Sequence, residues 1–196
     1  MGQYYHTIVR DPKTGKDTYY DQQTTLLKRD SKGNITDYST YNGLKLMEHS
    51  WWGNYFCQSL AATLVDNPQK VCWVGDYAEP DEGKALGFDT DAVWDSELTE
   101  TIGINKRFSL DSMKYLVNND KKVYVDLADY KKKSDTDGWV IFPVALLTAL
   151  GNGRGGGDFR GGTGEEQVGA WAFDEIYLTN GLPKGYERLE LAFVEK

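Results

Sequence analysis

The clearest helical periodicity in this chain lies in residues 55–65. Apolar side chains recur there every three or four positions and share one helical face: Phe56, Cys57, Leu60, Ala61, Leu64 and Val65. Such a stripe is typical of a helix that packs on a core. The run Asp66-Asn67-Pro68 follows it and is a stop signal. We therefore predict one main helix over residues 55–65.

Most of the remaining chain has the alternating, aromatic-rich pattern of short strands. Three predicted hairpins join residues 3–10 to 17–22, 24–29 to 34–38, and 114–118 to 122–127. Further strands are predicted over residues 44–49, 70–77, 139–142, 168–178 and 188–195. Residues 70–77 have apolar side chains on both faces, as a strand buried on both sides has. The basic, polar residues 131–137 are predicted to form a turn.

These patterns predict an α+β fold, in which mostly antiparallel hairpins form a sheet and the main helix packs on it. Residues 1–196 are predicted to be a single domain. A weak internal sequence similarity, which we call the sequence echo, divides the domain into halves, residues 1–80 and 108–196, joined by the acidic residues 81–107. Each half has a hairpin and then a tryptophan-containing segment that ends in aspartate, residues 71–76 and 168–174. The echo suggests a duplication in which a glycine-rich loop replaces the helix of the first half.

Composition and charge narrow the functional class. The chain is 40% hydrophobic and 13% aromatic, which indicates a folded protein. Its net charge of −8 argues against duplex nucleic acid as a partner, since phosphate contacts need a basic face. No apolar run approaches the roughly 18 residues of a membrane helix, and no signal peptide is recognised, so a cytoplasmic protein is expected. Cys57 and Cys72 lack metal-site spacing and are expected to be buried free thiols.

Residues 76–100 are strongly acidic. They hold one basic residue, Lys84, and nine carboxylates: Asp76, Glu79, Asp81, Glu82, Asp89, Asp91, Asp95, Glu97 and Glu100. An EF-hand starting at Asp89 is rejected, because Val93 stands where a ligand belongs and Trp94 where glycine is required. Two interpretations stay open: a solvated loop or helix face, and a surface that binds a basic protein.

Residues 151–160 form a glycine loop, Gly-Asn-Gly-Arg-Gly-Gly-Gly-Asp-Phe-Arg, whose backbone needs positive φ or a close approach. Its N–H groups could hold an anion, and its arginines could add bidentate contacts. It is neither a Walker A loop nor a dinucleotide fingerprint. The candidate ligand-binding residues here are Asn152, Arg154, Gly155, Gly156, Asp158 and Arg160. The alternative is a structural turn in which Asp158 pairs with Arg154 or Arg160.

Two further groups of residues are candidates. Glu48 and His49 are adjacent, but in a strand they would point to opposite faces and could not act as one acid–base pair. A mixed site of His49 with Asp76 is a weaker alternative, and no metal site is expected. Trp51 and Trp52 precede the main helix and are typical core residues. If one of them is exposed, it could stack on a nucleobase.

Several motifs resemble a family of small uncharacterised bacterial and phage proteins. They are Met1-Gly-Gln-Tyr-Tyr5, Gly43-Leu-Lys-Leu-Met-Glu-His-Ser50, Trp73-Val-Gly-Asp-Tyr77, Tyr115-Leu-Val-Asn118 with Lys121-Lys122, Leu147-Thr-Ala-Leu-Gly-Asn-Gly-Arg-Gly-Gly-Gly-Asp158 and Val168-Gly-Ala-Trp-Ala172. The resemblance covers nearly the whole chain and is weakest after Tyr77. It implies no activity, because none is assigned to the family.

Three functions stay open. The first is a non-catalytic module whose glycine loop holds an anionic small molecule such as a nucleotide, for example a phage or mobile-element protein that sequesters a host signalling nucleotide. The second is an acidic interaction or inhibitor protein that presents residues 76–100 to a basic partner. The third is a hydrolase that uses Glu48, His49 or Asp76. No cofactor is expected, and an oligomer is compatible with each function.

Overall fold

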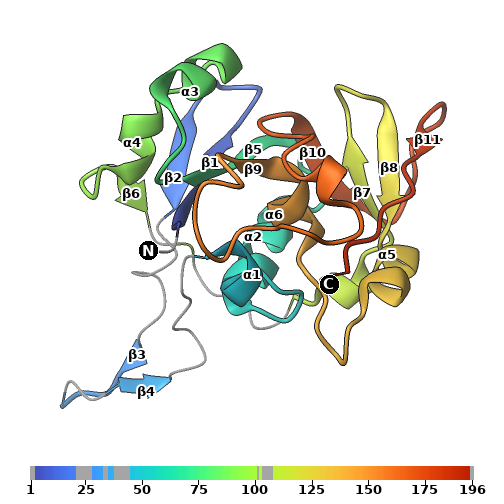
Figure 1. Ribbon diagram of the computed structural model, residues 1–196, viewed down its shortest axis with the longest axis horizontal. Helices are drawn as coiled ribbons and strands as arrows, with labels where there is room; N and C mark the ends of the chain where they lie inside the picture. Colours follow the sequence, from blue (N-terminus) through green and yellow to red (C-terminus); the bar gives the residue numbers. More distant parts are fainter. Residues whose placement is uncertain are drawn as a thin grey trace.

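Strands from both halves of the chain pair in one mixed sheet (Figure 1). The computed structural model describes residues 3–20, 28–32, 35–37, 45–100, 102 and 108–194. The strands of the sheet are β1 (Tyr5–Arg10), β2 (Asp17–Tyr20), β5 (Gln69–Gly75), β6 (Thr99–Glu100), β7 (Tyr115–Asn118), β8 (Val123–Asp126), β9 (Ala149–Leu150), β10 (Glu175–Thr179) and β11 (Glu187–Arg188). The helices are α1 (Leu46–His49), α2 (Tyr55–Thr63), α3 (Pro80–Leu86), α4 (Thr90–Trp94), α5 (Leu127–Ser134) and α6 (Pro143–Thr148). The α+β prediction is confirmed.

The strand order of the sheet is β11-β8-β7-β10-β5-β1-β2-β6. The two halves, which meet at the β5–β10 pair, have the same arrangement of strands when each is followed outward from this pair. In each half an antiparallel hairpin, β1–β2 or β7–β8, is flanked by an antiparallel strand, β5 or β10. A short strand, β6 or β11, pairs parallel with the second hairpin strand. The counterpart of β5 is therefore β10, and not residues 168–174 as the sequence echo predicts. Duplication itself stays a prediction.

The two halves differ most in one connection. Residues 76–98 join β5 to β6 and contain α3 and α4, whereas residues 180–186 join β10 to β11. The second half also has helices of its own, α5 and α6, so the predicted replacement of a helix by the glycine loop is wrong. The acidic residues thus form an insertion on one half of a repeated strand order.

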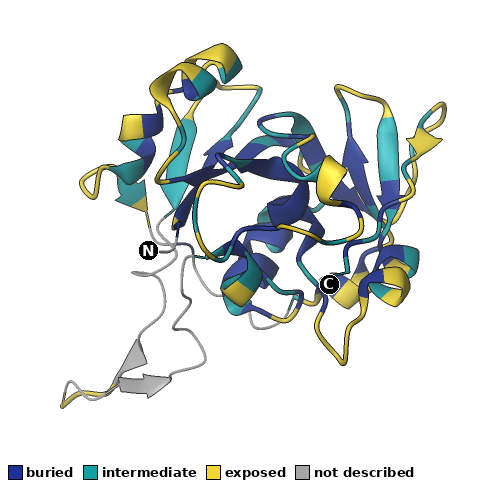
Figure 2. Ribbon diagram, in the orientation of Figure 1, coloured by how far each residue is buried: buried dark blue, intermediate teal, exposed yellow. Residues whose placement is uncertain are grey.

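Both faces of β5 are buried, which confirms the prediction for residues 71–75. The strand ends at Gly75, so the predicted extension to residue 77 is wrong, and Asp76 and Tyr77 are exposed. Val71 and Trp73 of β5 belong to the main core with α2, α5 and α6. Cys72 and Val74 point to the other face, where a smaller core also holds Phe88 and Val93 from the acidic insertion. In Figure 2 the central strands are buried, whereas α3 and α4 carry many exposed residues on their outer side.

Helix α2 confirms the prediction from periodicity. Phe56, Leu60 and Leu64 are fully or almost fully buried in the main core. The side chain of Asn54 caps the helix by accepting hydrogen bonds from the backbone N–H groups of Phe56 and Cys57. Within the described ranges, no helix combines the length and apolar character needed to cross a bilayer.

Several other predictions of local structure are wrong. Residues 45–49 contain the short helix α1 and not a strand, and residue 44 lies outside the described residues. Of the predicted turn over residues 131–137, residues 131–134 are the end of α5, and a tight turn follows at residues 136–139. Residues 139–142 form only isolated backbone bridges. In residues 168–178 and 188–195 strand pairing is confined largely to β10 and to Arg188 of β11. In each segment the backbone N–H and C=O groups form hydrogen bonds within a helix or turn, or through single bridges. The pattern of apolar residues cannot distinguish this from the continuous hydrogen bonding of a sheet.

The second predicted hairpin, residues 24–29 with 34–38, lies partly outside the described residues. Its described parts, β3 (Lys28–Arg29) and β4 (Ile35–Asp37), pair antiparallel in a separate two-stranded sheet.

Candidate functional site

The glycine loop folds around a carboxylate of its own. Asp158 is buried, and its Oδ2 accepts hydrogen bonds from the backbone N–H groups of Gly153 (2.7 Å) and Gly155 (3.0 Å). Its Oδ1 accepts a third from the Tyr5 hydroxyl (3.1 Å). Burial, and next the charge of Asp158, raises the pKa of Tyr5, so the hydroxyl stays protonated and can donate. Two N–H groups predicted to hold a ligand anion therefore bind Asp158.

The side chain of Arg154 points away from the loop and forms an ion pair with Glu82 of the acidic insertion. Its Nη1 and Nη2 donate to Glu82 Oε2 (2.6 Å) and Oε1 (2.9 Å), and Nη1 also donates to the Tyr77 carbonyl (2.7 Å). The predicted pairing of Arg154 with Asp158 is wrong. Partial burial opposes ionisation of Glu82, but hydrogen bonds from Arg154 and from the Glu79 backbone outweigh it and lower the pKa of Glu82.

The glycines of the loop allow two other segments to approach its backbone. A Cβ on Gly155 would lie 2.3 Å from Cβ of Gln3, and one on Gly157 would lie 2.8 Å from Cβ of Lys45. The Gln3 N–H also donates to the Gly156 carbonyl (3.1 Å). The predicted close approach is thus made by the chain itself.

Of the remaining loop candidates, Asn152 forms hydrogen bonds within the loop and Arg160 is exposed to solvent. The carboxamide of Asn152 donates to the Phe159 carbonyl (3.0 Å) and accepts from the Phe159 N–H (2.9 Å), which closes the loop. Arg160 is exposed and makes no ion pair with the described residues. The predicted pairing of Asp158 with Arg160 is therefore not seen among them.

Glu48 and His49 lie together at the end of α1. Glu48 Oε2 is 3.5 Å from His49 Nε2, so the expectation that a strand separates them is wrong. Burial, the largest effect, lowers the pKa of His49, although the Glu48 charge opposes this shift. Asp76 follows β5 and accepts a hydrogen bond from the Tyr4 N–H (3.1 Å). No cluster of three or more potential metal ligands occurs in the part of the chain that the structure describes.

Trp51 and Trp52 point into different surroundings. The Trp51 ring packs edge to face on Trp139, with centroids 5.4 Å apart. Trp52 is nearly buried, stacks on Tyr130, and donates from Nε1 to Asp111 Oδ1 (3.1 Å). The preference for a core role is thus supported for Trp52, whereas Trp51 lies at the surface beside an exposed ring.

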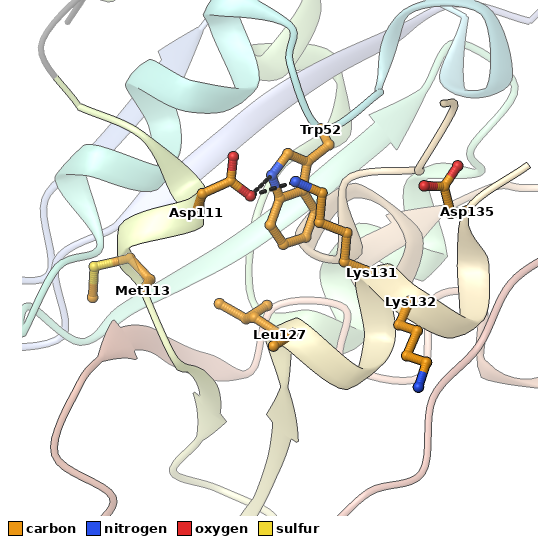
Figure 3. A pocket seen from close by; sticks show the side chains of 8 residues that line it. Trp52, Asp111, Met113, Leu127, Lys131, Lys132 and Asp135 are labelled. Carbon is orange, nitrogen blue, oxygen red and sulfur yellow. Dashed lines mark hydrogen bonds and ion pairs between the residues drawn. The ribbon is translucent and has the colours of Figure 1, made fainter. Parts of the chain in front are cut away.

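Trp52 lines a pocket of about 300 Å³ at the start of α5. Figure 3 shows Trp52 and Lys131 both directed at Asp111, with Met113 and Leu127 on the apolar wall. Lys131 Nζ lies 2.5 Å from Asp111 Oδ1 and 5.2 Å from the Trp52 ring centroid. A ligand stacking on this indole would have to displace Lys131. The pocket has two lysines and two aspartates, so it has no excess charge to select an anion.

The acidic insertion carries the whole net charge of the protein. Residues 76–100 hold nine of the 30 carboxylates and one of the 22 basic side chains, a charge of −8, and the remaining residues hold 21 of each sign. Eight of the nine carboxylates belong to exposed residues, Glu82 being the exception. Six make no ion pair with any described residue: Asp76, Glu79, Asp89, Asp91, Asp95 and Glu97.

The insertion packs against the sheet and pairs with the glycine loop. The Trp94 ring stacks on His6 at 4.0 Å, Phe88 packs on Phe173 at 4.8 Å, and Glu82 pairs with Arg154. An open groove of about 630 Å³ separates α3 and α4 from the β1–β2 hairpin, with Asp89, Asp91 and Tyr19 in its lining. The exposed carboxylates therefore lie on the outer side of a segment whose apolar residues pack on the rest of the protein.

Sequence reasoning missed α5 and with it the pocket of Figure 3. A signal was present: Asp126 caps the helix by accepting from the Asp129 N–H (3.0 Å), and Leu127 and Tyr130 follow at helical spacing. The three lysines after Tyr130 suit the last turn of a helix as well as a turn. Comparisons of this chain with protein-family models, curated proteins and solved structures find no match. The family resemblance therefore stays a prediction.

Proposed function

We propose that this protein is a non-catalytic interaction module that binds a basic surface of a partner protein through residues 76–100. One observation carries the proposal: the entire net charge of −8 lies on residues 76–100, almost all of whose carboxylates are exposed, and the rest of the chain is neutral. Six of these carboxylates have no ion pair within the described residues, so no basic neighbour there neutralises their charge.

Charge of this kind acts mainly on the rate of association. A surface of one sign attracts an oppositely charged partner over about a Debye length, roughly 10 Å at 0.1 M salt. Such steering is fast at low salt and weakens as salt is added. Exposed Leu98 and Tyr77 provide apolar contact area on the same segment. Once the surfaces meet, these side chains and the groove beside Asp89 would supply short-range contacts.

The first test locates the binding surface with a defined probe. A deca-lysine peptide is titrated into isotope-labelled protein at 50 mM salt, and amide shifts are followed. We expect the shifts to concentrate in residues 76–100. Shifts spread evenly over the exposed carboxylates would contradict the proposal, since they would show only general attraction.

The second test uses charge-matched variants and proteins captured from cells. One variant carries Asp89→Asn, Asp91→Asn and Asp95→Asn, and the control carries Asp135→Asn, Glu166→Gln and Glu187→Gln. We expect the first variant to slow association with a captured basic protein about tenfold at low salt and the control to slow it far less. Equal effects would reject a dedicated surface.

The small-molecule hypothesis for the glycine loop is a separate prediction, supported by the exposed Arg160 beside Gly153. Native mass spectrometry of protein purified from cells distinguishes it from the proposal. A retained nucleotide adds a few hundred daltons, on the order of a nucleotide's mass, whereas a protein partner adds its own mass.

A further inference from the structure

Trp139 is the most exposed large apolar side chain among the described residues, with 59% of its surface accessible. A tight turn holds it in place. Asp137 (φ 52°) and Gly138 (φ 89°) form its two central residues, and Thr136 and Trp139 exchange backbone hydrogen bonds of 3.0 and 2.9 Å. The exposure of this indole is therefore built into the backbone.

A second indole stands against the first. The Trp51 ring meets Trp139 at an interplanar angle of 71°, and it lies over Gly53, where a Cβ would come within 2.4 Å of the ring. An apolar hollow of about 350 Å³ adjoins Trp139, and Ile141 and Phe193 form part of its wall. We call this surface, Trp51, Trp139 and the hollow, the tryptophan platform. Trp139 belongs to the loop between α5 and α6, which Figure 1 shows far from α3 and α4.

The chemistry of the platform selects among ligands. The hollow is lined by Ser134, Thr136, Asp137, Trp139, Ile141 and Phe193, with no basic side chain, so a phosphate-bearing ligand lacks a counter-charge. Neither the Trp51 nor the Trp139 indole N–H has a hydrogen-bond partner among the described residues. The platform thus offers angled aromatic walls, free donors and one carboxylate.

From these features we infer that the tryptophan platform binds a proline-rich segment of a partner protein, in the polyproline II conformation, with a lysine or arginine beside the prolines. Proline rings fit between aromatic walls, and their carbonyls need donors because proline offers no N–H of its own. Asp137 at the rim matches the basic residue. The segment arrives already extended, which reduces the entropy lost on binding.

The test uses two synthetic peptides, octaproline and octaproline followed by arginine, titrated into labelled protein while the indole N–H signals are followed. We expect the Trp139 and Trp51 signals to move and the arginine peptide to bind more tightly. Trp139→Ala should weaken binding at least tenfold, as truncation of an anchoring tryptophan does. Leu182→Ala, at another exposed apolar residue, should have no effect.

Asp137→Asn tests the choice of peptide, because asparagine tolerates positive φ and keeps the turn. It should remove the two- to fivefold advantage of the arginine peptide, about the effect of an exposed ion pair, and leave octaproline binding unchanged. The inference is overturned if millimolar peptide leaves both indole signals in place, if Trp139→Ala binds as well as the parent, or if cellohexaose binds there instead. Neutralising Asp89, Asp91 and Asp95 should not affect this site, so its failure and that of the acidic surface are distinguishable.

Discussion

The glycine loop and the acidic insertion are the two regions of most unusual composition, and they differ in what their polar groups bind. In the loop, two backbone donors bind Asp158 and Arg154 binds Glu82. In residues 76–100, six carboxylates have no ion pair within the described chain. Charges that pair with one another hold a fold together, whereas exposed charges that no opposite charge neutralises remain available for another molecule. We therefore assign architecture to the first region and recognition to the second.

Removal of Asp158 should have the largest effect. Asp158→Ala removes a buried carboxylate and leaves the Gly153 and Gly155 N–H groups and the buried Tyr5 hydroxyl without this acceptor, at about 1–3 kcal/mol for each group that stays shielded from water. We expect the free energy of unfolding in urea to fall by about 3–5 kcal/mol. Asp91→Ala, on the exposed insertion, is the matched control and should cost less than about 1 kcal/mol. Similar losses for both would remove the distinction between the regions.

The next largest loss of stability is expected when a methyl group is added to the glycine loop. Gly155→Ala would place Cβ 2.3 Å from Cβ of Gln3 and 2.6 Å from its backbone nitrogen, so the start of β1 must move. Overpacking of this kind costs about 1–3 kcal/mol. Gly181→Ala has open space around it and should change stability by less than about 0.5 kcal/mol. Thermal unfolding of both variants makes the comparison, and an unaffected Gly155→Ala would mean that the loop yields easily.

The Arg154–Glu82 pair joins the two regions and predicts a pH dependence. Because the folded-state pKa of Glu82 is lowered, its stabilising contribution is present above the ordinary value of 4.5 and is lost as pH falls through the folded-state pKa. The pair is about one-third exposed, so Arg154→Ala should cost less than about 1 kcal/mol at pH 7. The difference from the parent should shrink below pH 4.5 in urea titrations. A difference that is constant with pH would mean that the Tyr77 carbonyl contact dominates.

The smallest effect on stability should come from the acidic surface itself. Asp89→Asn, Asp91→Asn and Asp95→Asn together should leave the melting temperature within a few degrees of the parent, since asparagine still caps α4 at position 89. A small increase is compatible with relieved repulsion. A large loss would show that these carboxylates stabilise the fold, and it would remove the basis for a recognition role.

Local patterns predicted those parts of the fold that depend on local contacts. The spacing of Phe56, Leu60 and Leu64 located α2, and the turn between β1 and β2 located the first hairpin. Short helices such as α1 are stabilised by tertiary packing more than by helix propensity. The local sequence of residues 44–49 therefore gave no helical signal, and a strand was predicted there. The strand order could not be derived, because β5 pairs with β1 and β10 across long stretches of sequence.

The candidate site shows the same limit. The sequence predicted that the backbone of the glycine loop is approached closely, but not that the neighbour is Gln3. It identified residues 76–100 as acidic without distinguishing a solvated surface from a recognition surface. The sequence predicted only part of the tryptophan platform. Trp51 was a candidate residue, whereas Trp139, which lies in a distant turn, was not. Contacts between segments far apart in the chain have no local signature.

The contact of Gln3 and Tyr5 with residues 155–158 also affects how the chain folds during synthesis. Gln3 and Tyr5 leave the ribosome well before residues 155–158, yet their hydrogen bonds to Gly156 and Asp158 form only after those residues have been made. At about 5–20 residues per second, the early strands wait many seconds for these partners. The long sequence separation also implies slow folding in vitro. The strand edges exposed in the meantime make the nascent chain prone to aggregation until these partners are made.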